Sequence, residues 1–369
     1  ITSNKTCSVT FKSNLPTLYA KILADKTTRP FRVSFSTVLT NDNTKTLYKS
    51  IENNTTVYYF AGNATDNWVK FGKHINDVVV YRGYNQQGSR YQDFNSFNDC
   101  NTSNYNSDCT KRVIAKSGEP IYWRIIRTNA DGSIKLLYHG SSTTSTDAYL
   151  GFSSYSSENS TMSVGYMYGT SGSLENNRLN TNSSIIKDFL DTWYQENLLT
   201  NYDRYLSEDA IYCNDRNLAN GYNFSLNALM YYKAYDRLYN TQSPTYNCTN
   251  EYDSFSGNNP KAKLDYPIAL MTADEASFAG GYYNSDSTPY YYYNSNNSSS
   301  IDQYSFWTMT PTYSDSSESR VYYVYKRLAS SPVAPIFGDL IRPVISIKGN
   351  SAYKSGDGSS SNPYEIKMN

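Results

Sequence analysis

Short runs that alternate apolar and polar residues occupy the first third of the chain. The longest covers residues 31–38, and further apolar-rich runs lie at 57–60, 68–71 and 78–81. Alternation with a period of two is typical of a half-buried strand, and the glycines between these runs indicate turns. We therefore predict a β-rich N-terminal region over residues 1–115.

The most distinct hairpin follows this region directly. Two apolar runs, 121–127 and 133–138, are joined by a short loop that contains Asp131-Gly132. A glycine after an aspartate supplies the positive φ that a tight hairpin turn requires. Asn129 and Asp131 are also residue types that bind calcium, but the loop lacks the other ligands of a calcium site. We interpret this segment as a turn.

Apolar residues with helical spacing appear in the middle of the chain. In residues 185–198, one apolar stripe includes Ile186, Leu190 and Trp193, which predicts an amphipathic helix. Lys187 falls outside that stripe. Residues 226–238 have a similar but weaker pattern, which predicts a second helix.

A capping-box pattern marks a brief third helix. Thr272 and Glu275 have the required spacing, and Gly280-Gly281 ends the segment. The apolar run 268–271 just before it predicts a short buried strand. A loop rich in Tyr, Asn and Ser extends from about residue 282 to 303.

Three apolar runs complete the chain, at 306–309, 321–325 and 341–347, and we predict a strand at each. The order of elements indicates an α+β fold. In this interpretation, residues 116–369 form a second module with two or three short helices and a sheet that bears the long loop.

Composition and charge exclude several classes of partner. The chain has 369 residues, and 33 Lys and Arg balance 33 Asp and Glu to give a formal net charge of +0. A neutral chain without basic tracts has no electrostatic footprint for nucleic acid or an anionic membrane. No apolar run reaches the ~18 residues of a membrane span. We expect any anchor to lie upstream of Ile1.

Tyrosine is the most unusual component, since the chain contains 39 of them. A tyrosine ring offers a rigid apolar face with a polar tip, and together with Ser and Asn it suits wet contact surfaces. The long loop combines all three residue types. We predict that the ligand-binding residues are Tyr282, Tyr283, Tyr290, Tyr291, Tyr292, Tyr293 and Trp307.

The five cysteines indicate an oxidising compartment. Cys100 and Cys109 enclose a short polar loop, and Cys213 and Cys248 flank the second predicted helix, so we predict two disulfides. Cys7 is left over, as a free thiol or an intermolecular link. The alternative is five unrelated buried thiols, which the polar residues around Cys100, Cys109 and Cys248 disfavour.

A set of short motifs occurs in a fixed order along residues 57–366. It resembles a signature of uncharacterised exported proteins of gut-dwelling bacteria, and the matching segments are 122–127, 131–134, 164–169, 191–194, 213–216, 266–268, 272–275, 307–311, 342–345, 356–358 and 362–364.

The last part of the chain, with Trp307 on one strand and Arg342-Pro343-Val344 on the final one, looks like the C-type-lectin-like fold in its formylglycine-generating-enzyme branch. The resemblance implies a compact sheet with a variable loop surface. Those enzymes use late cysteines, whereas no cysteine follows Cys248. Calcium-binding lectins carry a Trp-Asn-Asp motif, whereas Thr308 and Met309 follow Trp307. We expect no metal and no cofactor.

Candidate catalytic residues each have a simpler structural explanation. His74 and His139 lie in different segments, and we interpret each as a surface or turn residue. Glu275 fits a helix cap, and an aspartate beside it favours the helix dipole. Asp215-Arg216 is interpreted as a buried ion pair that fixes the segment after Cys213, and the alternative is a carboxylate that binds a ligand. An enzyme would need a pocket lined by Asp215, Asp274 or Glu275, and we predict that the chain is not an enzyme.

These observations predict an extracellular cell-surface protein. Its role would be non-catalytic recognition or adhesion to a glycan or protein ligand on another surface. The alternative is a structural subunit of a self-assembling filament or surface coat, because a neutral, tyrosine-rich chain with an unpaired Cys7 also favours subunit contacts.

Overall fold

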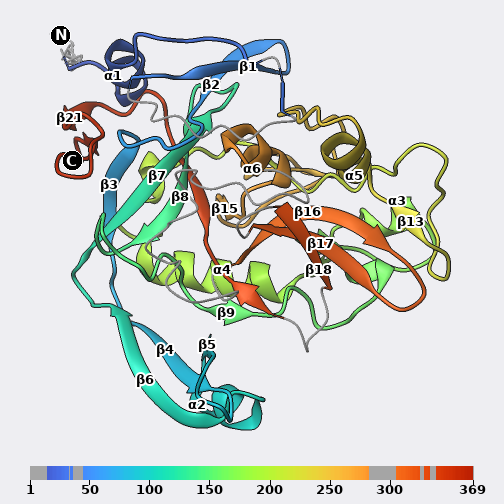
Figure 1. The fold of residues 1–369 in the computed structure, drawn as a ribbon. Helices are drawn as coiled ribbons and strands as arrows, with labels where there is room; N and C mark the ends of the chain where they lie inside the picture. Colours follow the sequence, from blue (N-terminus) through green and yellow to red (C-terminus); the bar gives the residue numbers. More distant parts are fainter. Residues whose placement is uncertain are drawn as a thin grey trace, which may run out of the picture.

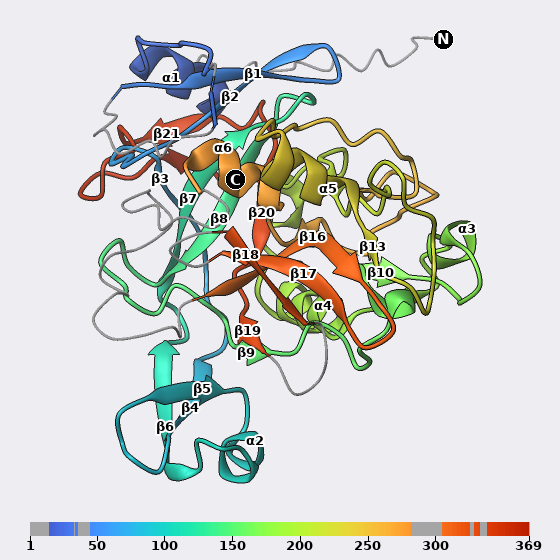
Figure 2. The same ribbon diagram turned by 45° about the vertical axis from the view of Figure 1, so that its right-hand side comes forward.

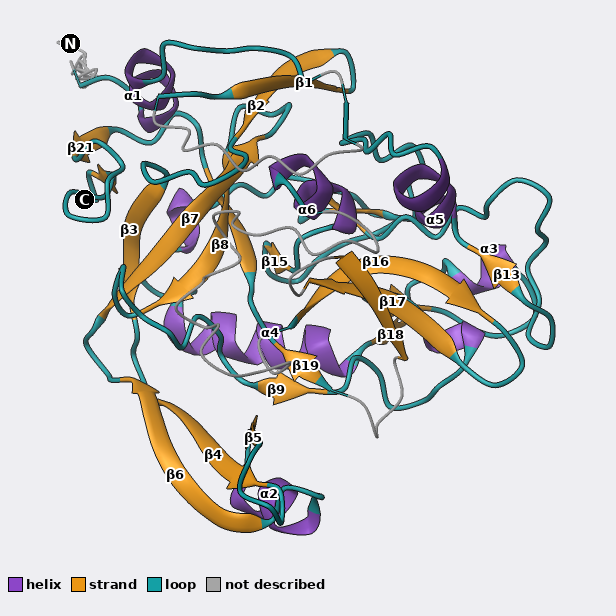
Figure 3. Cartoon of the chain, viewed as in Figure 1, coloured by secondary structure: helices purple, strands orange, loops and turns teal. Residues whose placement is uncertain are grey.

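A computed structural model describes residues 15–32, 34–35, 45–281, 305–324, 328–332 and 338–368. The fold is a β-rich α+β arrangement with 34% strand and 17% helix, in which several antiparallel sheets surround a common core. Strands dominate the architecture, and the longest helix of the described residues is α4 (Ile185–Asn197) (Figure 3). The predicted α+β class is therefore confirmed.

The largest sheet among the described residues has seven strands, in the order β1-β2-β7-β8-β20-β15 with β3 beside β7. Its strands are β1 (Tyr48–Glu52), β2 (Thr55–Tyr59), β3 (Trp68–Lys73), β7 (Pro120–Thr128), β8 (Ile134–Gly140), β15 (Ile268–Ala269) and β20 (Val344–Ile347). Since β1, β2 and β3 share this sheet with β7, the boundary predicted near residue 115 falls between strands of one sheet.

A second sheet of six strands lies beside α4 and contains the antiparallel hairpin of residues 306–324 (Figure 1). Its path is β18-β17-β16-β19-β9, and β13 also pairs with β16. The strands are β9 (Phe152–Ser153), β13 (Met230–Tyr231), β16 (Phe306–Ser314), β17 (Ser319–Val324), β18 (Leu328–Pro332) and β19 (Asp339–Leu340).

A three-stranded sheet projects from the rest of the chain, at the end opposite α1 (Leu18–Asp25), in both ribbon views (Figures 1 and 2). Its order is β5-β4-β6, formed by β4 (Val78–Tyr84), β5 (Tyr91–Phe94) and β6 (Ser107–Ala115), and α2 (Phe97–Thr102) covers its tip. We call residues 78–115 the projecting lobe.

Short elements complete the fold. Three two-stranded ladders pair β10 (Met167–Tyr168) with β11 (Asn182–Ser183), β12 (Tyr212–Cys213) with β14 (Ser254–Phe255), and β21 (Tyr353–Ser355) with β22 (Glu365–Ile366). The other helical segments are α3 (Leu174–Asn177), α5 (Lys233–Tyr235), α6 (Ala273–Ala279), two 3-10 turns at Thr161–Ser163 and Asp203–Tyr205, and a π-helical turn at Asp236–Asn240.

The local signals of the sequence produce the elements they predict in several places. The β7–β8 hairpin turns at Gly132, whose φ is +80°. The Ser184 side chain caps α4 by accepting a hydrogen bond from the Lys187 backbone N–H at 3.2 Å. In α6 the Thr272 and Glu275 capping box is complete, and Gly280 ends the helix at a φ of +128°. These signals lie within one element, so distant contacts do not override them.

The second predicted helix is wrong. Instead of a helix over 226–238, the chain forms strand β13, the three-residue α5 and the π-helical turn. Leu226 and Leu229, which belong to the predicted apolar stripe, are exposed. Met230 and Leu238 of the same stripe are buried, so its apolar residues divide between the surface and the core and do not form one helical face that packs against the core.

Candidate functional site

Of the aromatic residues predicted to bind a ligand, the structure describes Trp307 and does not describe the six tyrosines. Tyr282, Tyr283, Tyr290, Tyr291, Tyr292 and Tyr293 lie outside the described residues. Trp307 lies in β16 with 0% exposure, and its Nε1–H donates to the Ser153 backbone oxygen at 2.8 Å. Its ring meets Tyr155 edge to face at 5.6 Å between centroids. This placement corrects the expectation that Trp307 belongs to an exposed surface.

A different group of tyrosines forms a continuous row near the end of β16. We call it the tyrosine cluster, and its members are Tyr222, Tyr231, Tyr235, Tyr239 and Tyr313. Neighbouring ring centroids lie between 4.2 Å and 5.6 Å apart. Tyr222 and Tyr239, at its two ends, are 38% and 41% exposed. The cluster lies around β13 and α5, far from the projecting lobe (Figure 2).

Three elements position the cluster. Tyr231 and Tyr313 are direct cross-strand partners of β13 and β16. Tyr235 and Tyr239 are four residues apart, so the helical turn places them on one face. Tyr313 donates its hydroxyl hydrogen to Glu318 Oε1 at 2.6 Å, and burial followed by this bond raises the pKa of Tyr313 to about 12. The hydroxyl of Tyr313 therefore stays protonated at neutral pH.

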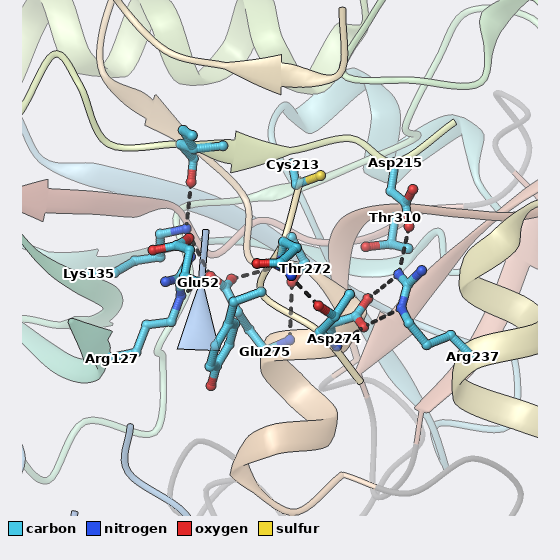
Figure 4. A pocket seen from close by; sticks show the side chains of 14 residues that line it. Glu52, Arg127, Lys135, Cys213, Asp215, Arg237, Thr272, Asp274, Glu275 and Thr310 are labelled. Carbon is cyan, nitrogen blue, oxygen red and sulfur yellow. Dashed lines mark hydrogen bonds and ion pairs between the residues drawn. The ribbon is translucent and has the colours of Figure 1, made fainter. Parts of the chain in front are cut away.

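A second candidate site is a small pocket between β7, β8, α6 and the π-helical turn (Figure 4). We call it the buried charge pocket, and its charged members are Glu52, Arg127, Lys135, Asp215, Arg237, Asp274 and Glu275. The structure thus brings together all three carboxylates that an enzyme would require. The cavity is only about 20 Å³, which is room for roughly one water molecule.

One half of this pocket is centred on Glu275. Arg127 Nε lies 2.9 Å and Lys135 Nζ 2.8 Å from Glu275 Oε1, and Arg127 Nη2 lies 2.9 Å from Glu52 Oε1. The second oxygen of Glu275 accepts the Thr272 backbone N–H at 2.9 Å. Burial alone would raise the pKa of Glu275, but Lys135 and Arg127 lower it to about 2. Glu275 is therefore a permanent anion that neutralises two buried cations.

The other half is centred on Arg237. Its guanidinium makes a bidentate pair with Asp274, with both N–O distances 2.7 Å, and its Nη2 also lies 2.6 Å from Asp215 Oδ2. The backbone N–H of Thr245 donates to Asp274 Oδ1 at 2.8 Å. Burial raises the pKa of Asp215, while Arg237 opposes the shift. The charges of these groups are paired with one another, and the pair of Asp274 with Arg237 joins α6 to the π-helical turn.

The predicted ion pair between Asp215 and Arg216 is wrong. Arg216 is fully buried, but its Nε lies 2.7 Å from Asp253 Oδ1, whereas Asp215 pairs with Arg237. Asp215 has a φ of +49°, a left-handed backbone conformation that turns the chain at this residue, and the two side chains reach different partners. Arg178 Nη2 also lies 3.0 Å from Asp253 Oδ2, which makes Asp253 the common anion.

Both histidines are buried rather than exposed, which corrects the surface interpretation. His74 Nε2 lies 3.2 Å from the Tyr138 hydroxyl, and burial lowers the pKa of His74 to about 4. His139 packs edge to face against Trp68 at 4.4 Å between centroids. Burial, with Arg124 and Arg342 adding repulsion, lowers the pKa of His139 well below its usual value. Both rings are therefore neutral members of the core.

The two predicted disulfides are present, Cys100–Cys109 and Cys213–Cys248. The first ties α2 to β6, and the second joins β12 to the segment before β14. Such bonds are consistent with an extracytoplasmic location. Cys7 lies outside the described residues. Among the residues described, no helix has the length and apolar character to span a membrane, and no group of three metal-ligating side chains gathers.

The tyrosine cluster was missed because its residues belong to three separate elements. The spacing of Tyr235 and Tyr239 was the one local signal that the sequence held. Comparison with models of protein families, with curated proteins and with solved structures finds no match to this chain.

Proposed function

We propose that this chain is an extracellular protein that acts in non-catalytic recognition or adhesion, and that its ligand is a glycan or protein on another surface. The observation that carries the proposal is the tyrosine cluster, a row of contiguous rings with exposed members at both ends. Tyrosine offers a large contact area at low cost in conformational entropy, because its side chain has only two rotatable angles.

The surroundings of the cluster support this role. Tyr231 is held by strand pairing and Tyr313 by its bond to Glu318, so part of the surface is ordered before a ligand arrives. The hydroxyl groups of the tyrosine cluster add hydrogen-bonding capacity at the edge of the rings. The neutral charge of the whole chain favours uncharged ligands over nucleic acid or anionic lipid.

The finer parts of the hypothesis are proposed with it. The ordered motifs of residues 57–366 support an exported protein of a gut-dwelling bacterium. The resemblance at Trp307 and Arg342-Pro343-Val344 supports a C-type-lectin-like module over residues 116–369, whose main sheet also includes β1, β2 and β3. An experimental structure, superimposed on C-type-lectin-like domains, would test the module. The two disulfides support a place on the cell exterior.

An alternative function is a subunit of a filament or surface coat. Leu226 and Leu229, which follow Tyr222 in the chain, are 40% and 48% exposed. Exposed apolar residues beside aromatic rings are typical of subunit interfaces. In this case the tyrosine cluster would contact a second copy of the chain.

Glycan and mucin-glycoprotein arrays, probed with the full chain, test both functions. We expect the double variant Tyr222→Ser/Tyr239→Ser to lose about tenfold or more in affinity, and Tyr222→Phe/Tyr239→Phe to keep most of it. The control is Leu199→Ser, which replaces a 41% exposed apolar residue outside the tyrosine cluster and should leave the affinity unchanged. Unchanged binding by the serine variant would exclude the cluster as the ligand surface. Light scattering that shows polymers of the wild type, and monomers of that variant, would favour the subunit.

A further inference from the structure

An open cleft separates the projecting lobe from the main body. It lies between β5 and α2 on the lobe and β9 on the main body, and Figures 1 and 2 show β9 as the part of the main body nearest to β5. Its volume is about 710 Å³, which falls in the range of small-ligand sites. We call it the polar cleft.

The lining of the cleft combines aromatic rings with uncharged polar groups. The rings are those of Phe94, Tyr105 and Phe152, and the amides include those of Gln92 and Asn104. Serine and threonine hydroxyls and the Asn95 amide are also in the lining. Among the described residues that line the cleft, Asp99 is the one carboxylate, and none is a lysine, arginine or histidine. Such a surface suits a neutral ligand that has many hydroxyl groups and some apolar area.

The two walls are held at a fixed separation. Asp93 on β5 makes a bidentate pair with Arg82, both N–O distances being 2.7 Å, and also accepts hydrogen bonds from Arg112 at 3.2 Å and from the Tyr149 hydroxyl. Arg112 continues to Asp147, with an N–O distance of 3.2 Å. Because Asp147 and Tyr149 belong to the main body, this cluster joins the lobe to the body at the base of the cleft.

Direct contacts across the base add to this rigidity. Asn95 Oδ1 accepts the Phe152 backbone N–H at 2.9 Å, and the rings of Phe94 and Phe152 meet edge to face at 5.9 Å. A side chain at Gly338 would place its Cβ 2.4 Å from Phe152 Cε1, so this glycine leaves room for the ring that lines the cleft. A preformed site of this kind binds without a large ordering cost.

Several polar groups of the lining have unused bonding capacity. Within the described residues, the side-chain amides of Gln92 and Asn104, the carboxylate of Asp99 and the hydroxyl of Ser154 make no hydrogen bond to other protein groups. Their neighbour Thr102 differs, since its hydroxyl donates to the Asn98 backbone oxygen at 2.8 Å. These groups lie on both walls, with Gln92, Asp99 and Asn104 on the lobe and Ser154 on the main body.

We propose that the polar cleft binds a neutral oligosaccharide, as a site separate from the tyrosine cluster. The faces of Tyr105 and Phe152 would pack against sugar rings, while the amides of Gln92 and Asn104 and the carboxylate of Asp99 would bind sugar hydroxyls. An anionic saccharide has no cation to pair with in the lining and would meet Asp99.

The test uses the full chain and a panel of neutral tetrasaccharides built from glucose, mannose, galactose or N-acetylglucosamine. Saturation-transfer NMR detects binding and calorimetry measures it. We expect Gln92→Ala/Asn104→Ala to weaken binding about tenfold or more, because it removes two amides that bind hydroxyls. Asn101→Ala is the matched control, since this exposed amide on α2 lies outside the lining, and it should leave affinity within about twofold.

A blocking variant keeps the test independent of the small substitutions. Asn104 is exposed, so Asn104→Trp should fold, as circular dichroism would verify, and its ring should exclude the sugar from the cleft. The proposal is overturned if no panel member binds, if an oligogalacturonate binds more tightly than the neutral sugars, or if binding survives both sets of variants. Tyr222→Ser/Tyr239→Ser should retain cleft binding, so a failure here is distinguishable from a failure of the tyrosine cluster.

Discussion

The buried charge pocket and the polar cleft differ in almost every property that bears on binding. The pocket contains seven charged side chains around a cavity of about 20 Å³, whereas the cleft has one carboxylate and a volume of about 710 Å³. In the pocket, Glu275 and Arg237 each bind two partners of opposite charge. In the cleft, the side-chain amides of Gln92 and Asn104 make no hydrogen bond to other described protein groups.

Under the two proposals above, a concentration of charge does not mark the binding site of this protein. A buried ion pair costs desolvation energy unless its groups satisfy one another, and a network that is fully satisfied has little left to offer a ligand. Polar groups that remain free in an open cleft can bind a ligand without first breaking internal bonds. We therefore expect the pocket to contribute to stability, and we propose recognition for the cleft and the tyrosine cluster.

The largest effect that follows from this assignment is expected at the centre of the pocket. Glu275→Gln removes one negative charge and leaves Arg127 and Lys135 buried with a weaker partner, which should lower the free energy of unfolding by about 3–5 kcal/mol. Urea denaturation measures the change. Sugar binding by the polar cleft should be unaffected in the folded variant.

The control for that variant is an ion pair at the surface. Lys354 Nζ lies 2.7 Å from Glu365 Oε2, but the lysine side chain is 58% exposed, so Lys354→Ala should cost under about 1 kcal/mol. If Glu275→Gln cost no more than this, the pocket would not be a structural network and an enzymatic role for its carboxylates would deserve a test.

The two disulfides provide a second way to separate the regions. Cys213 lines the pocket and its bond closes a separation of 35 residues, whereas Cys100–Cys109 holds the lobe and closes only 9. Loop-closure entropy predicts losses of about 4 kcal/mol for Cys213→Ser/Cys248→Ser and about 2.5 kcal/mol for Cys100→Ser/Cys109→Ser. Thermal unfolding would rank the two.

Measurement of sugar binding by the same two double variants distinguishes the lobe from the pocket. We expect only Cys100→Ser/Cys109→Ser to weaken sugar binding, because only that bond holds α2 against β6 beside the cleft. An equal loss of binding in both double variants would mean that the lobe and the body do not act separately.

A pH profile probes the core with a smaller effect. The pKa of His74 is about 4 in the folded protein and about 6.5 when unfolded, so only the unfolded state gains the proton between these values. The contribution of His74 to the free energy of unfolding should therefore fall by about 3 kcal/mol as the pH decreases from 6.5 to 4.

The comparison of wild type with His74→Gln isolates this contribution. Burial raises the pKa of Asp339 to about 7, so Asp339 acts in the opposite direction and favours the folded state as pH falls, but it is present in both proteins and cancels. A stability difference that stays constant between pH 6.5 and 4 would contradict a neutral, buried His74.

The sequence alone was sufficient where the determining residues lie close together in the chain. The β7–β8 hairpin, α4, the capping box of α6 and both disulfides were predicted from local patterns. The helix predicted over 226–238 failed because an apolar stripe forms a helix only when it finds a surface to pack against. The prediction that His74 and His139 lie at the surface also failed, because no local pattern in the sequence shows which distant residues will cover a side chain.

The candidate sites were decided by tertiary structure. The charged residues of the buried pocket come from distant segments of the chain, and Arg127 and Glu275, which contact each other, are 148 positions apart. The polar cleft requires the lobe and β9 to meet, and the tyrosine cluster requires β13 to pair with β16. Short-range patterns specify turns, caps and helices because their energies act within a few residues. Which distant side chains become neighbours depends on how the sheets close around the core, and that is set by packing of the whole chain.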